Sequence, residues 1–497
     1  MVGGGIGSSF SDDAGKIAGW RFWGMLKMGN EANEMKIRDY LLLGLAIIFG
    51  CCLRLRHIEA NGLWLDEAFS VATSDPDNSF INVYKRTLSD VHPPFYQLLL
   101  WAFYKGFGYA EMTGRYLSVF FGTLLIPLMF YLGRQLLNNR AGLVCAWLSA
   151  VNFYLVTYSQ ETRSYSLLVF LVVLSFVVFI TAVRNPTTSN VTVYALVLAV
   201  LANTHYFGLL PIAAQVILFF LLNGWQDLRK EVLLRFSIAG VFVLVTLSPA
   251  AFYIMGALER KEFWVPVPND HFFVELFALF FGGLSLSIIS SILILSGLVT
   301  LIKEKSMRVV LWVVVIWVVV CVMVPYLRSL YVQPVLTMRN LIVVLPALML
   351  LLGYGVSQLR DRVVFNSVVF VMFSFSMTPL FTDEKPVFTY ENQLRPVSQM
   401  RDVIKNLIDH CSSCLIYSPD VIEAQGYAKI LGSTLKFRSI DLMEKDIESS
   451  AKPLDFFIFT TRGTWEDDTS YMNRIGFYLV KGNQNGDSSS NEYRSNH

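Results

Sequence analysis

Two adjacent carboxylates are the first residues of this chain that could take part in chemistry. Asp66 and Glu67 follow Trp64 and Leu65 and lie close to long apolar segments. At a membrane surface, neighbouring acids beside an aromatic ring are costly unless they are paired or used. The same acids would also suit the first turn of a helix, because they complement the helix dipole. The pair alone therefore leaves a catalytic and a structural interpretation open.

A histidine followed by two prolines lies farther along the chain. His92 precedes Pro93 and Pro94, and an apolar segment starts directly after them. The prolines predict an extended entry and then the first turn of a helix, with the imidazole held just outside that turn. The motif fits a site residue beside a helix end, and it equally fits a plain helix start.

Two arginines occur at the ends of apolar segments. Glu161, Arg163 and Tyr165 share one short polar segment between two such runs, and Arg339 stands at the start of another. A guanidinium can bind a phosphate with two hydrogen bonds, so either arginine could hold a phosphorylated lipid. The alternatives are an internal pair of Glu161 with Arg163, and an Arg339 side chain that reaches toward the membrane interface.

The composition indicates a polytopic membrane protein. Hydrophobic residues make up 54% of the 497 residues and charged residues 16%, and the mean hydropathy is +0.50. Soluble domains carry about 25% charged residues, so the composition excludes a water-soluble fold. The net charge is +2 and there is no nucleic-acid-binding motif, so no nucleic-acid partner is expected.

The apolar runs predict about eleven transmembrane helices. They lie near 40–53, 115–133, 141–158, 166–183, 191–204, 206–222, 232–253, 284–302, 308–325, 341–358 and 363–381. If the segment 94–108 lies at the interface as a juxtamembrane helix, the amino terminus and the later basic loops face the cytoplasm, as the positive-inside rule prefers. Arg54 and Arg56 are exceptions, and their long side chains are expected to reach the headgroups.

Changes in composition divide the chain into domains. Residues 1–38 are a cytoplasmic segment, either an interfacial helix or a disordered tail. Residues 39–382 form the membrane domain, whose first extracytoplasmic loop, 54–114, carries the paired acids. Residues 385–480 alternate helical and strand-like runs, which predicts a small extracytoplasmic α/β domain. Asn, Gly and Ser dominate 481–497, which predicts a disordered tail.

The α/β domain has a simple predicted pattern. Helices are expected over 397–407 and 421–431, and strands over 414–417 and 454–460. Cys411 and Cys414 precede the first strand. Their spacing fits a disulfide in an oxidising compartment, and it also fits two buried thiols.

The polar motifs share one membrane face, although the topology was derived without them. Their order is Trp-Leu-Asp-Glu at 64–67, Asp-Val-His-Pro-Pro at 90–94 and Tyr-Ser-Gln-Glu-x-Arg-x-Tyr at 158–165. This order resembles the bacterial branch of the protein O-mannosyltransferase family, the PMT/ArnT-like proteins. Thr-His-Tyr-Phe around His205 and the Arg339-Asn pair also look like that family. The resemblance covers about residues 40–380.

The resemblance implies an all-α polytopic protein with the C-type glycosyltransferase (GT-C) fold. It implies transfer of a sugar from a polyprenyl-phosphate-linked donor to an acceptor on the extracytoplasmic side, with inversion at the anomeric carbon. Asp66 matches the catalytic base, and Glu67, its neighbour in the motif, is counted with it among the catalytic residues. If the segment is helical, the two side chains point about 100° apart, and the alternative for Glu67 is to orient the loop or pair with a base. Arg163, Tyr165 and Arg339 match the side that binds the donor phosphate. The residues expected to support the site are His92, Pro93, Pro94, Glu161 and His205.

Several points stay open at the level of sequence. The acceptor can be a protein, a lipid or a glycan, and the sugar is not specified. No cofactor is required, although the acids and His92 could hold a divalent metal ion. The expected location is the bacterial inner membrane, with membrane lipids and the lipid-linked donor as partners. The alternative functions are a transporter or flippase of lipid-linked sugars, and a scaffold for envelope assembly.

Overall fold

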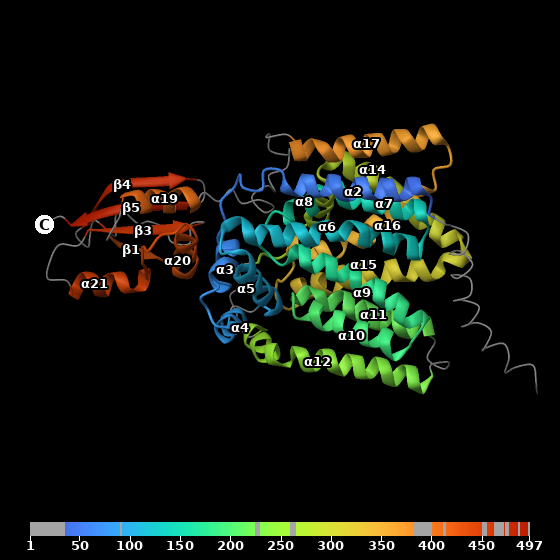
Figure 1. Cartoon of the computed structure of the whole chain (residues 1–497), viewed down its shortest axis with the longest axis horizontal. Coiled ribbons are helices and arrows are strands. Elements are labelled where there is room, and N and C mark those ends of the chain that lie inside the picture. The colour runs from blue at the N-terminus through green and yellow to red at the C-terminus, as the bar shows by residue number, and fades with distance from the viewer. Residues whose placement is uncertain are drawn as a thin grey trace, which may run out of the picture.

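The structure of the chain is a computed structural model. It describes residues 35–89, 92–223, 229–258, 265–381, 400–410, 414–449, 455–461, 472, 477–485 and 488–495. Most of the predicted cytoplasmic segment 1–38 therefore lies outside the described residues. Long helices run side by side in one bundle, and a smaller sheet domain lies at one end of it (Figure 1). This arrangement confirms a polytopic helical protein with a small carboxy-terminal sheet domain.

Seven of the described helical segments are long and apolar enough to cross a membrane. They contain the helices α6 (Glu111–Leu136), α9 (Tyr165–Arg184), α11 (Leu209–Asn223), α12 (Lys230–Leu258), α14 (Leu284–Lys303), α15 (Arg308–Tyr331) and α17 (Arg362–Phe381). Each corresponds to one predicted span. The chain is therefore an integral membrane protein.

The remaining four predicted spans are also helical, but they are shorter, interrupted or more polar. They correspond to α2 (Ile37–Leu55), α7 (Asn139–Val151) with α8 (Phe153–Tyr158), α10 (Thr188–Ala202), and the 3-10 helix η3 (Arg339–Val343) followed by α16 (Leu345–Ser357). Asn152 separates α7 from α8 and accepts a hydrogen bond from the Leu155 amide at 3.0 Å, so it caps the second helix.

Glycines let neighbouring helices approach closely. A Cβ atom on Gly142 of α7 would lie 2.7 Å from the Phe130 carbonyl oxygen of α6. A Cβ atom on Gly355 of α16 would collide with the Leu293 carbonyl of α14. Small residues are used in this way where membrane helices pack without a hydrophobic driving force between them.

Arg54 does not reach the headgroups, so that expectation is wrong. Its side chain is fully buried and donates to the carbonyl oxygens of Ser149 at 2.9 Å and Ala150 at 3.1 Å. Those carbonyls belong to the last turn of α7, where the helix dipole is negative. Its Nε also donates to the Ser159 hydroxyl at 3.2 Å. The cation is stabilised inside the bundle and does not need water.

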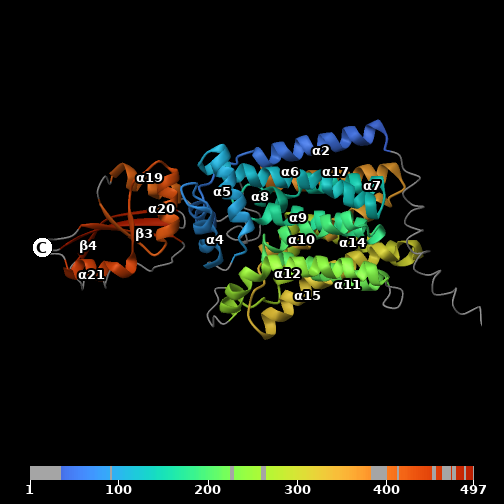
Figure 2. The same ribbon diagram turned by 60° about the horizontal axis from the view of Figure 1, so that its bottom comes forward.

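Short helices gather at one end of the bundle, which we call the loop end. They are α3 (Leu65–Thr73), α4 (Phe80–Ser89) and α5 (Phe95–Phe107), and they lie between the bundle and the sheet domain (Figure 2). A fourth short helix, α13 (Phe272–Phe281), precedes α14. The 13-residue α5 is the predicted juxtamembrane helix of 94–108.

The carboxy-terminal domain is a five-stranded mixed sheet in the order β2-β1-β3-β5-β4. The parallel part contains β1 (Leu415–Ser418), β2 (Phe437–Ser439) and β3 (Phe456–Thr461), and the helices are α19 (Met400–His410), α20 (Val421–Ile430) and α21 (Met443–Ser449). The α20 crossover between two parallel strands forms a βαβ unit. The predicted α/β pattern agrees with these elements within a few residues at each boundary.

The predicted disordered tail over 481–497 is wrong over most of its length. β4 (Phe477–Asn485) and β5 (Ser488–Ser495) form an antiparallel pair, and β5 also pairs with β3. The sheet satisfies the backbone of this polar segment, and the buried Tyr493 ring lies 5.8 Å from Phe456. The Asn485-Gly486 dipeptide, a strong hairpin signal, could have revealed the turn.

Of the two cysteines considered for a bridge, Cys414 is disulfide-bonded in the structure. Cys411 lies outside the described residues, so the pairing of these two residues stays a prediction.

Candidate active site

Helix α3 presents the two acids at the loop end. Trp64 is its N-cap with extended backbone, and the Trp64 amide donates to Glu67 Oε2 at 3.4 Å. Asp66 and Glu67 lie in the first turn, where the helix dipole favours negative charge. The expectation that they suit a helix start is confirmed. Successive side chains point about 100° apart around a helix, so the acids face different surroundings.

Asp66 faces two arginines that come from distant parts of the chain. Its Oδ2 lies 2.9 Å from Arg339 Nη1 and 3.9 Å from Arg163 Nη2. Arg163 Nη1 also donates to the Asp66 carbonyl at 2.9 Å and to the Ser70 hydroxyl at 2.9 Å. We call Asp66, Arg163 and Arg339 the Asp66 cluster. The Asp66 side chain is 25% exposed, so water or a ligand can reach the carboxylate.

Arg339 is fixed by the start of η3 and by aromatic groups. The Tyr154 hydroxyl donates to the Met338 carbonyl at 2.7 Å and thereby fixes the residue before the arginine. The Arg339 guanidinium lies 5.2 Å from the centre of the Trp64 ring, within the range of a cation–π contact. Burial disfavours its charge, but Tyr165 and Asp66 together raise the pKa of Arg339 above its ordinary value.

A group of aromatic rings extends from the Asp66 cluster toward the next helices. The Tyr165 ring centre lies 4.8 Å from that of Tyr158 and 6.0 Å from that of His205. Tyr158 is in turn 4.8 Å from Tyr154. Tyr165, predicted on the donor side, therefore lies within a buried aromatic layer next to Arg339.

The His-Pro-Pro segment also joins this end of the bundle. Pro94 is the N-cap of α5, and the Phe95 amide after it donates to the Asn203 carbonyl at 2.9 Å. This bond connects the prolines to the segment that carries His205. The His92 ring lies 6.4 Å from the Phe69 ring of α3.

His205 is held as a neutral group. Its Nδ1 accepts a hydrogen bond from the Phe207 amide at 3.1 Å. Burial lowers the pKa of His205 to about 3, and the neighbouring Arg163 and Arg339 guanidinium groups act in the same direction. The imidazole therefore remains neutral at physiological pH, and because Nδ1 accepts from Phe207, the proton is on Nε2, which can donate a hydrogen bond.

Glu161 lies in the same short turn as Arg163. The residue is buried, and its carbonyl accepts a hydrogen bond from the Ser118 hydroxyl of α6 at 2.6 Å. That bond fixes the turn from which Arg163 extends toward Asp66. Each of the residues predicted for the site thus contributes to the loop end of the bundle.

Glu67 belongs to a separate, buried contact that sequence reasoning missed. Arg115 of α6 binds it with Nε–Oε1 at 3.1 Å and Nη2–Oε2 at 3.0 Å, and the Thr162 amide donates to Oε1 at 2.7 Å. We call Glu67, Arg115 and Thr162 the Glu67 anchor. An ionisable residue at the end of an apolar span was the signal that could have identified Arg115.

Arg115 also binds the loop that precedes α3. It donates to the carbonyl oxygens of Ile58 at 2.7 Å, Asn61 at 2.9 Å and Gly62 at 3.0 Å. One buried guanidinium therefore connects α6, the 58–62 loop and α3. The Glu67 anchor fixes the position from which Asp66 is presented.

The carboxy-terminal domain is bound to the same loop. Tyr427 of α20 accepts a hydrogen bond from the Leu63 amide at 2.8 Å and donates to Glu111 Oε1 at 3.0 Å. Arg401 of α19 pairs with Glu111 at 2.6 Å. A Cβ atom on Gly426 would collide with Ala72 of α3, so α20 packs directly on the helix that carries Asp66.

Within the described residues, no group of three or more His, Cys, Asp or Glu side chains could hold a metal ion. The Asp66 carboxylate faces guanidinium groups instead. The arrangement can accept a proton at Asp66 and bind an anion at the arginines.

Residues 91–253 match the model of the dolichyl-phosphate-mannose-protein mannosyltransferase family. No curated protein matches the sequence. ArnT from Cupriavidus metallidurans in the apo state is structurally similar, with a TM-score of 0.61 and 12% identity over 91% of this chain and 97% of that one. The same protein bound to undecaprenyl phosphate gives a TM-score of 0.57 with 14% identity, over 91% and 97%.

The archaeal oligosaccharyltransferase AglB from Archaeoglobus fulgidus, in complex with an inhibitory peptide and a dolichol-phosphate, gives a TM-score of 0.54 with 10% identity. The similarity covers 92% of this chain and 74% of AglB. These similarities extend over the membrane domain and the sheet domain together. The structural similarities show that this chain has the GT-C fold of these glycosyltransferases.

Proposed function

We propose that this protein transfers a sugar from a polyprenyl-phosphate-linked donor to an acceptor on the extracytoplasmic side of the membrane. The observation that carries the proposal is the partly exposed Asp66 carboxylate, 2.9 Å from Arg339 and 3.9 Å from Arg163. A carboxylate beside two cations suits a reaction in which a proton is removed while a phosphate departs. The undecaprenyl phosphate bound by ArnT supports this class of donor.

Asp66 acts as the general base in this proposal. An acceptor hydroxyl or amine attacks the anomeric carbon of the donor sugar from the face opposite the phosphate, while Asp66 Oδ takes the acceptor proton. The bond between the anomeric carbon and the phosphate oxygen breaks, and its electron pair leaves with the polyprenyl phosphate. Attack from the opposite face inverts the anomeric centre. General base catalysis of this kind contributes roughly 10²- to 10⁴-fold in rate.

Arg339 and Arg163 bind the departing phosphate. A guanidinium carries five N–H donors, so Arg339 can hold Asp66 through Nη1 and a phosphate through its other edge. Arg163 supplies a second positive charge, 3.9 Å from the same oxygen of Asp66. Burial acts against both charges, but Asp66 raises the pKa of Arg163, and Tyr165 and Asp66 raise the pKa of Arg339, so both groups stay charged.

Glu67 takes a positioning role. Its two oxygens already receive hydrogen bonds from Arg115, Thr162 and Trp64, and its side chain is 2% exposed. It therefore fixes α3 and does not touch the reacting atoms. The neutral His205, together with His92 and Tyr165, borders the site on the side of the aromatic layer.

The decisive experiment compares Asp66→Asn with the wild type. Asn keeps the shape of the side chain and removes its basicity. Mass spectrometry would measure lipid-linked sugars and glycoconjugates in cells that carry the wild-type gene, the variant or no gene. We expect the variant to accumulate the lipid-linked donor and to lose the glycosylated product, as the deletion does. Binding of undecaprenyl phosphate to the purified variant, measured by native mass spectrometry, should persist.

A matched control is Asp77→Asn, which changes an acid in the same loop whose side chain is 81% exposed. It should keep full transfer. Normal transfer by a correctly inserted Asp66→Asn variant would contradict the proposed mechanism and would favour a scaffold. If the protein were instead a flippase, the purified wild type would transfer no sugar, and Asp66→Asn would change only the distribution of the lipid between the two leaflets.

A further inference from the structure

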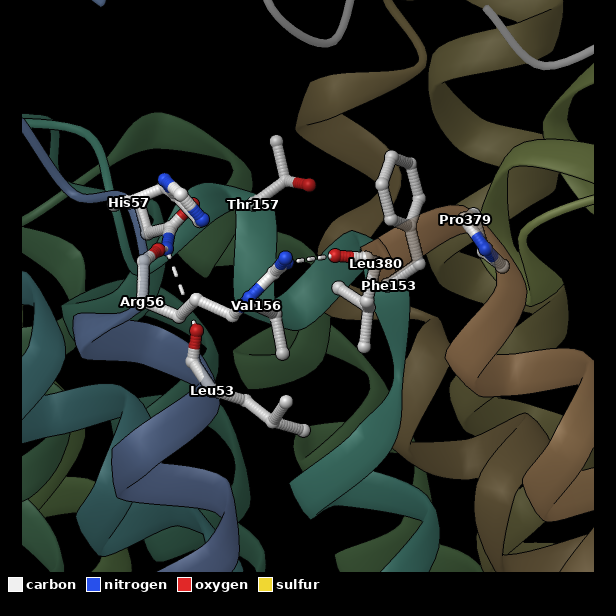
Figure 3. A pocket seen from close by; sticks show the side chains of 9 residues that line it. Leu53, Arg56, His57, Phe153, Val156, Thr157, Pro379 and Leu380 are labelled. Atoms are coloured by element: carbon white, nitrogen blue, oxygen red, sulfur yellow. Dashed lines mark hydrogen bonds between the residues drawn. The ribbon is translucent and has the colours of Figure 1, made fainter. Parts of the chain in front are cut away.

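Helix α17 is attached to the bundle tightly at the loop end. Arg56 donates to the Leu380 carbonyl, and its guanidinium lies 4.2 Å from the centre of the Phe381 ring. Figure 3 shows Arg56 and Leu380 around a small cavity of about 50 Å³ whose wall also includes Phe153 and Pro379. This end of α17 leaves almost no room for a ligand.

At its other end α17 also contacts the bundle, since the Arg140 guanidinium of α7 lies 4.0 Å from the centre of the Phe365 ring, but a groove opens along one side of α17. The groove has a volume of about 1110 Å³ and lies between α2, α7 and α17. Only 11% of the apolar stretch of α17 is buried, and Phe370 on it is 70% exposed. Pockets for small molecules are typically about 300–1,000 Å³, so the groove can hold a larger molecule such as a lipid.

The two ends of the groove differ in chemistry. Toward the loop end it is lined by three aromatic rings, with centroids 6.2 Å apart for Phe49 and Trp147 and 5.8 Å apart for Phe49 and Phe373. At the opposite end its lining contains the charged side chains Lys36, Arg38, Asp39 and Arg140. Three cations against one acid give this end an excess of two positive charges.

The length of the groove fits one acyl chain. Lys36 and Phe49 mark its ends on α2, and 13 residues of helix span about 20 Å. One leaflet of the hydrocarbon core is about 15 Å thick, half of roughly 30 Å. A lipid whose headgroup lies at the cations would therefore place its chain against Trp147.

We propose that this groove binds one anionic glycerophospholipid, with its phosphate at Lys36, Arg38 and Arg140 and an acyl chain along α7 and α17. The site lies at the end of the bundle opposite the Asp66 cluster and does not depend on the proposed function. In the predicted topology that end faces the cytoplasm, where anionic lipids attract basic side chains. A zwitterionic phospholipid would bring its own positive group against the same three cations and bind more weakly.

Trp147 provides a direct probe of the site. The full chain would be reconstituted in bilayers of phosphatidylcholine and phosphatidylglycerol, with bromine on the acyl chains of one lipid at a time. The fluorescence difference between the wild type and Trp147→Phe reports quenching at Trp147 alone. We expect phosphatidylglycerol to be preferred by at least about fivefold, the size of one cation's contribution near an anionic surface.

Two kinds of variant test the two parts of the groove. Replacing Lys36, Arg38 and Arg140 together by Gln should abolish the preference for phosphatidylglycerol, whereas the same change at Lys303, Lys305 and Arg308, three exposed cations outside the groove, should leave it intact. Val369→Phe, at an exposed groove position on α17, should reduce quenching by both lipids.

Three outcomes would overturn the proposal. Equal quenching by both lipids in the wild type would leave only unspecific lipid contact. A preference retained in the triple Gln variant would remove the assigned headgroup site. Quenching that is absent in the full chain and appears only after deletion of residues 1–34 would mean that the protein's own amino-terminal segment occupies the groove.

Discussion

The Asp66 cluster and the Glu67 anchor are built on neighbouring acids that differ in the exposure of their side chains and in their bonding partners. The Asp66 side chain is 25% exposed and forms ion pairs with Arg163 and Arg339. The Glu67 side chain is 2% exposed and is held by Arg115 through both oxygens. One acid lies at a surface that a ligand can reach, and the other lies inside the protein.

The difference in exposure suits Asp66 to a chemical role and Glu67 to a structural one. A buried carboxylate with all its hydrogen-bonding positions occupied cannot exchange a partner without a large penalty. A partly exposed carboxylate between two cations can exchange partners, because water or a ligand replaces the contacts that it gives up. The Glu67 anchor supplies the rigid support that a site needs if its reacting groups are to keep their geometry.

The largest expected effect is on stability, at the Glu67 anchor. Glu67→Gln leaves the Arg115 charge buried without its partner, which should lower the free energy of unfolding by about 3–5 kcal/mol. Thermal denaturation in detergent would measure the loss. Asp66→Asn is the matched control, because a partly exposed pair contributes only about 0–1 kcal/mol. Equal stability of the two variants would remove the distinction between the acids.

The next effect concerns the Asp66 cluster itself. Arg339→Lys keeps the charge but loses the planar fork that can bind a carboxylate and a phosphate together. Loss of a charge-assisted hydrogen bond costs about 1.5–3 kcal/mol, so transfer should fall roughly 10- to 150-fold. Rates with a fixed amount of membrane-extracted lipid-linked donor would show it. Arg308→Lys, far from the cluster, should be neutral, and full activity of Arg339→Lys would assign the phosphate to Arg163 alone.

A smaller effect tests whether the sheet domain supports the Glu67 anchor. Tyr427→Phe removes the hydroxyl that accepts from the Leu63 amide, next to the loop that Arg115 holds. A buried donor without a partner costs about 1–3 kcal/mol, so the melting temperature should fall moderately. Tyr478→Phe, at a position that is 44% exposed on β4, should not change it. Limited proteolysis of the 58–64 loop would show whether a fall in stability is local.

Much of the membrane fold could be predicted from the sequence. Apolar length and the distribution of basic loops predicted the spans and the position of α5, because both follow from the cost of polar groups in lipid. Arg54 was misjudged, since the carbonyl groups at the end of α7 that stabilise it belong to another helix. The β4–β5 hairpin was missed because pairing with β3, and not its own composition, orders it.

The site was predictable as a set of residues and not as a geometry. Topology placed Asp66 and Arg339 on one face, but their 2.9 Å contact joins residues 273 positions apart. The sequence indicated that Asp66 and Glu67 need not share a role, but it did not identify the partner of Glu67, because Arg115 belongs to another helix. Only the packed structure shows which carboxylate is buried and which is exposed.

The smallest expected effect is on the pH dependence of stability, and it concerns the His205 imidazole beside the Asp66 cluster. The pKa of His205 is lowered from an ordinary 6.5 to about 3, first by burial and then by the charges of Arg163 and Arg339. Between these two values the unfolded chain binds a proton that the folded chain does not. Stability should therefore rise with pH from about 3 to 6.5 and gain nothing from this group above that range.

His205→Gln removes this contribution while keeping a polar side chain. The difference in melting temperature between pH 7.5 and pH 5 should consequently be smaller for the variant than for the wild type, by a few degrees at most. His410→Gln, at an exposed position near the end of α19, should retain the wild-type difference. Parallel pH curves for His205→Gln and the wild type would mean that neither burial nor the arginines of the Asp66 cluster lower the pKa of His205 in the folded chain. His205 would then be accessible to water, and the comparison with the Glu67 anchor would not extend beyond the two acids.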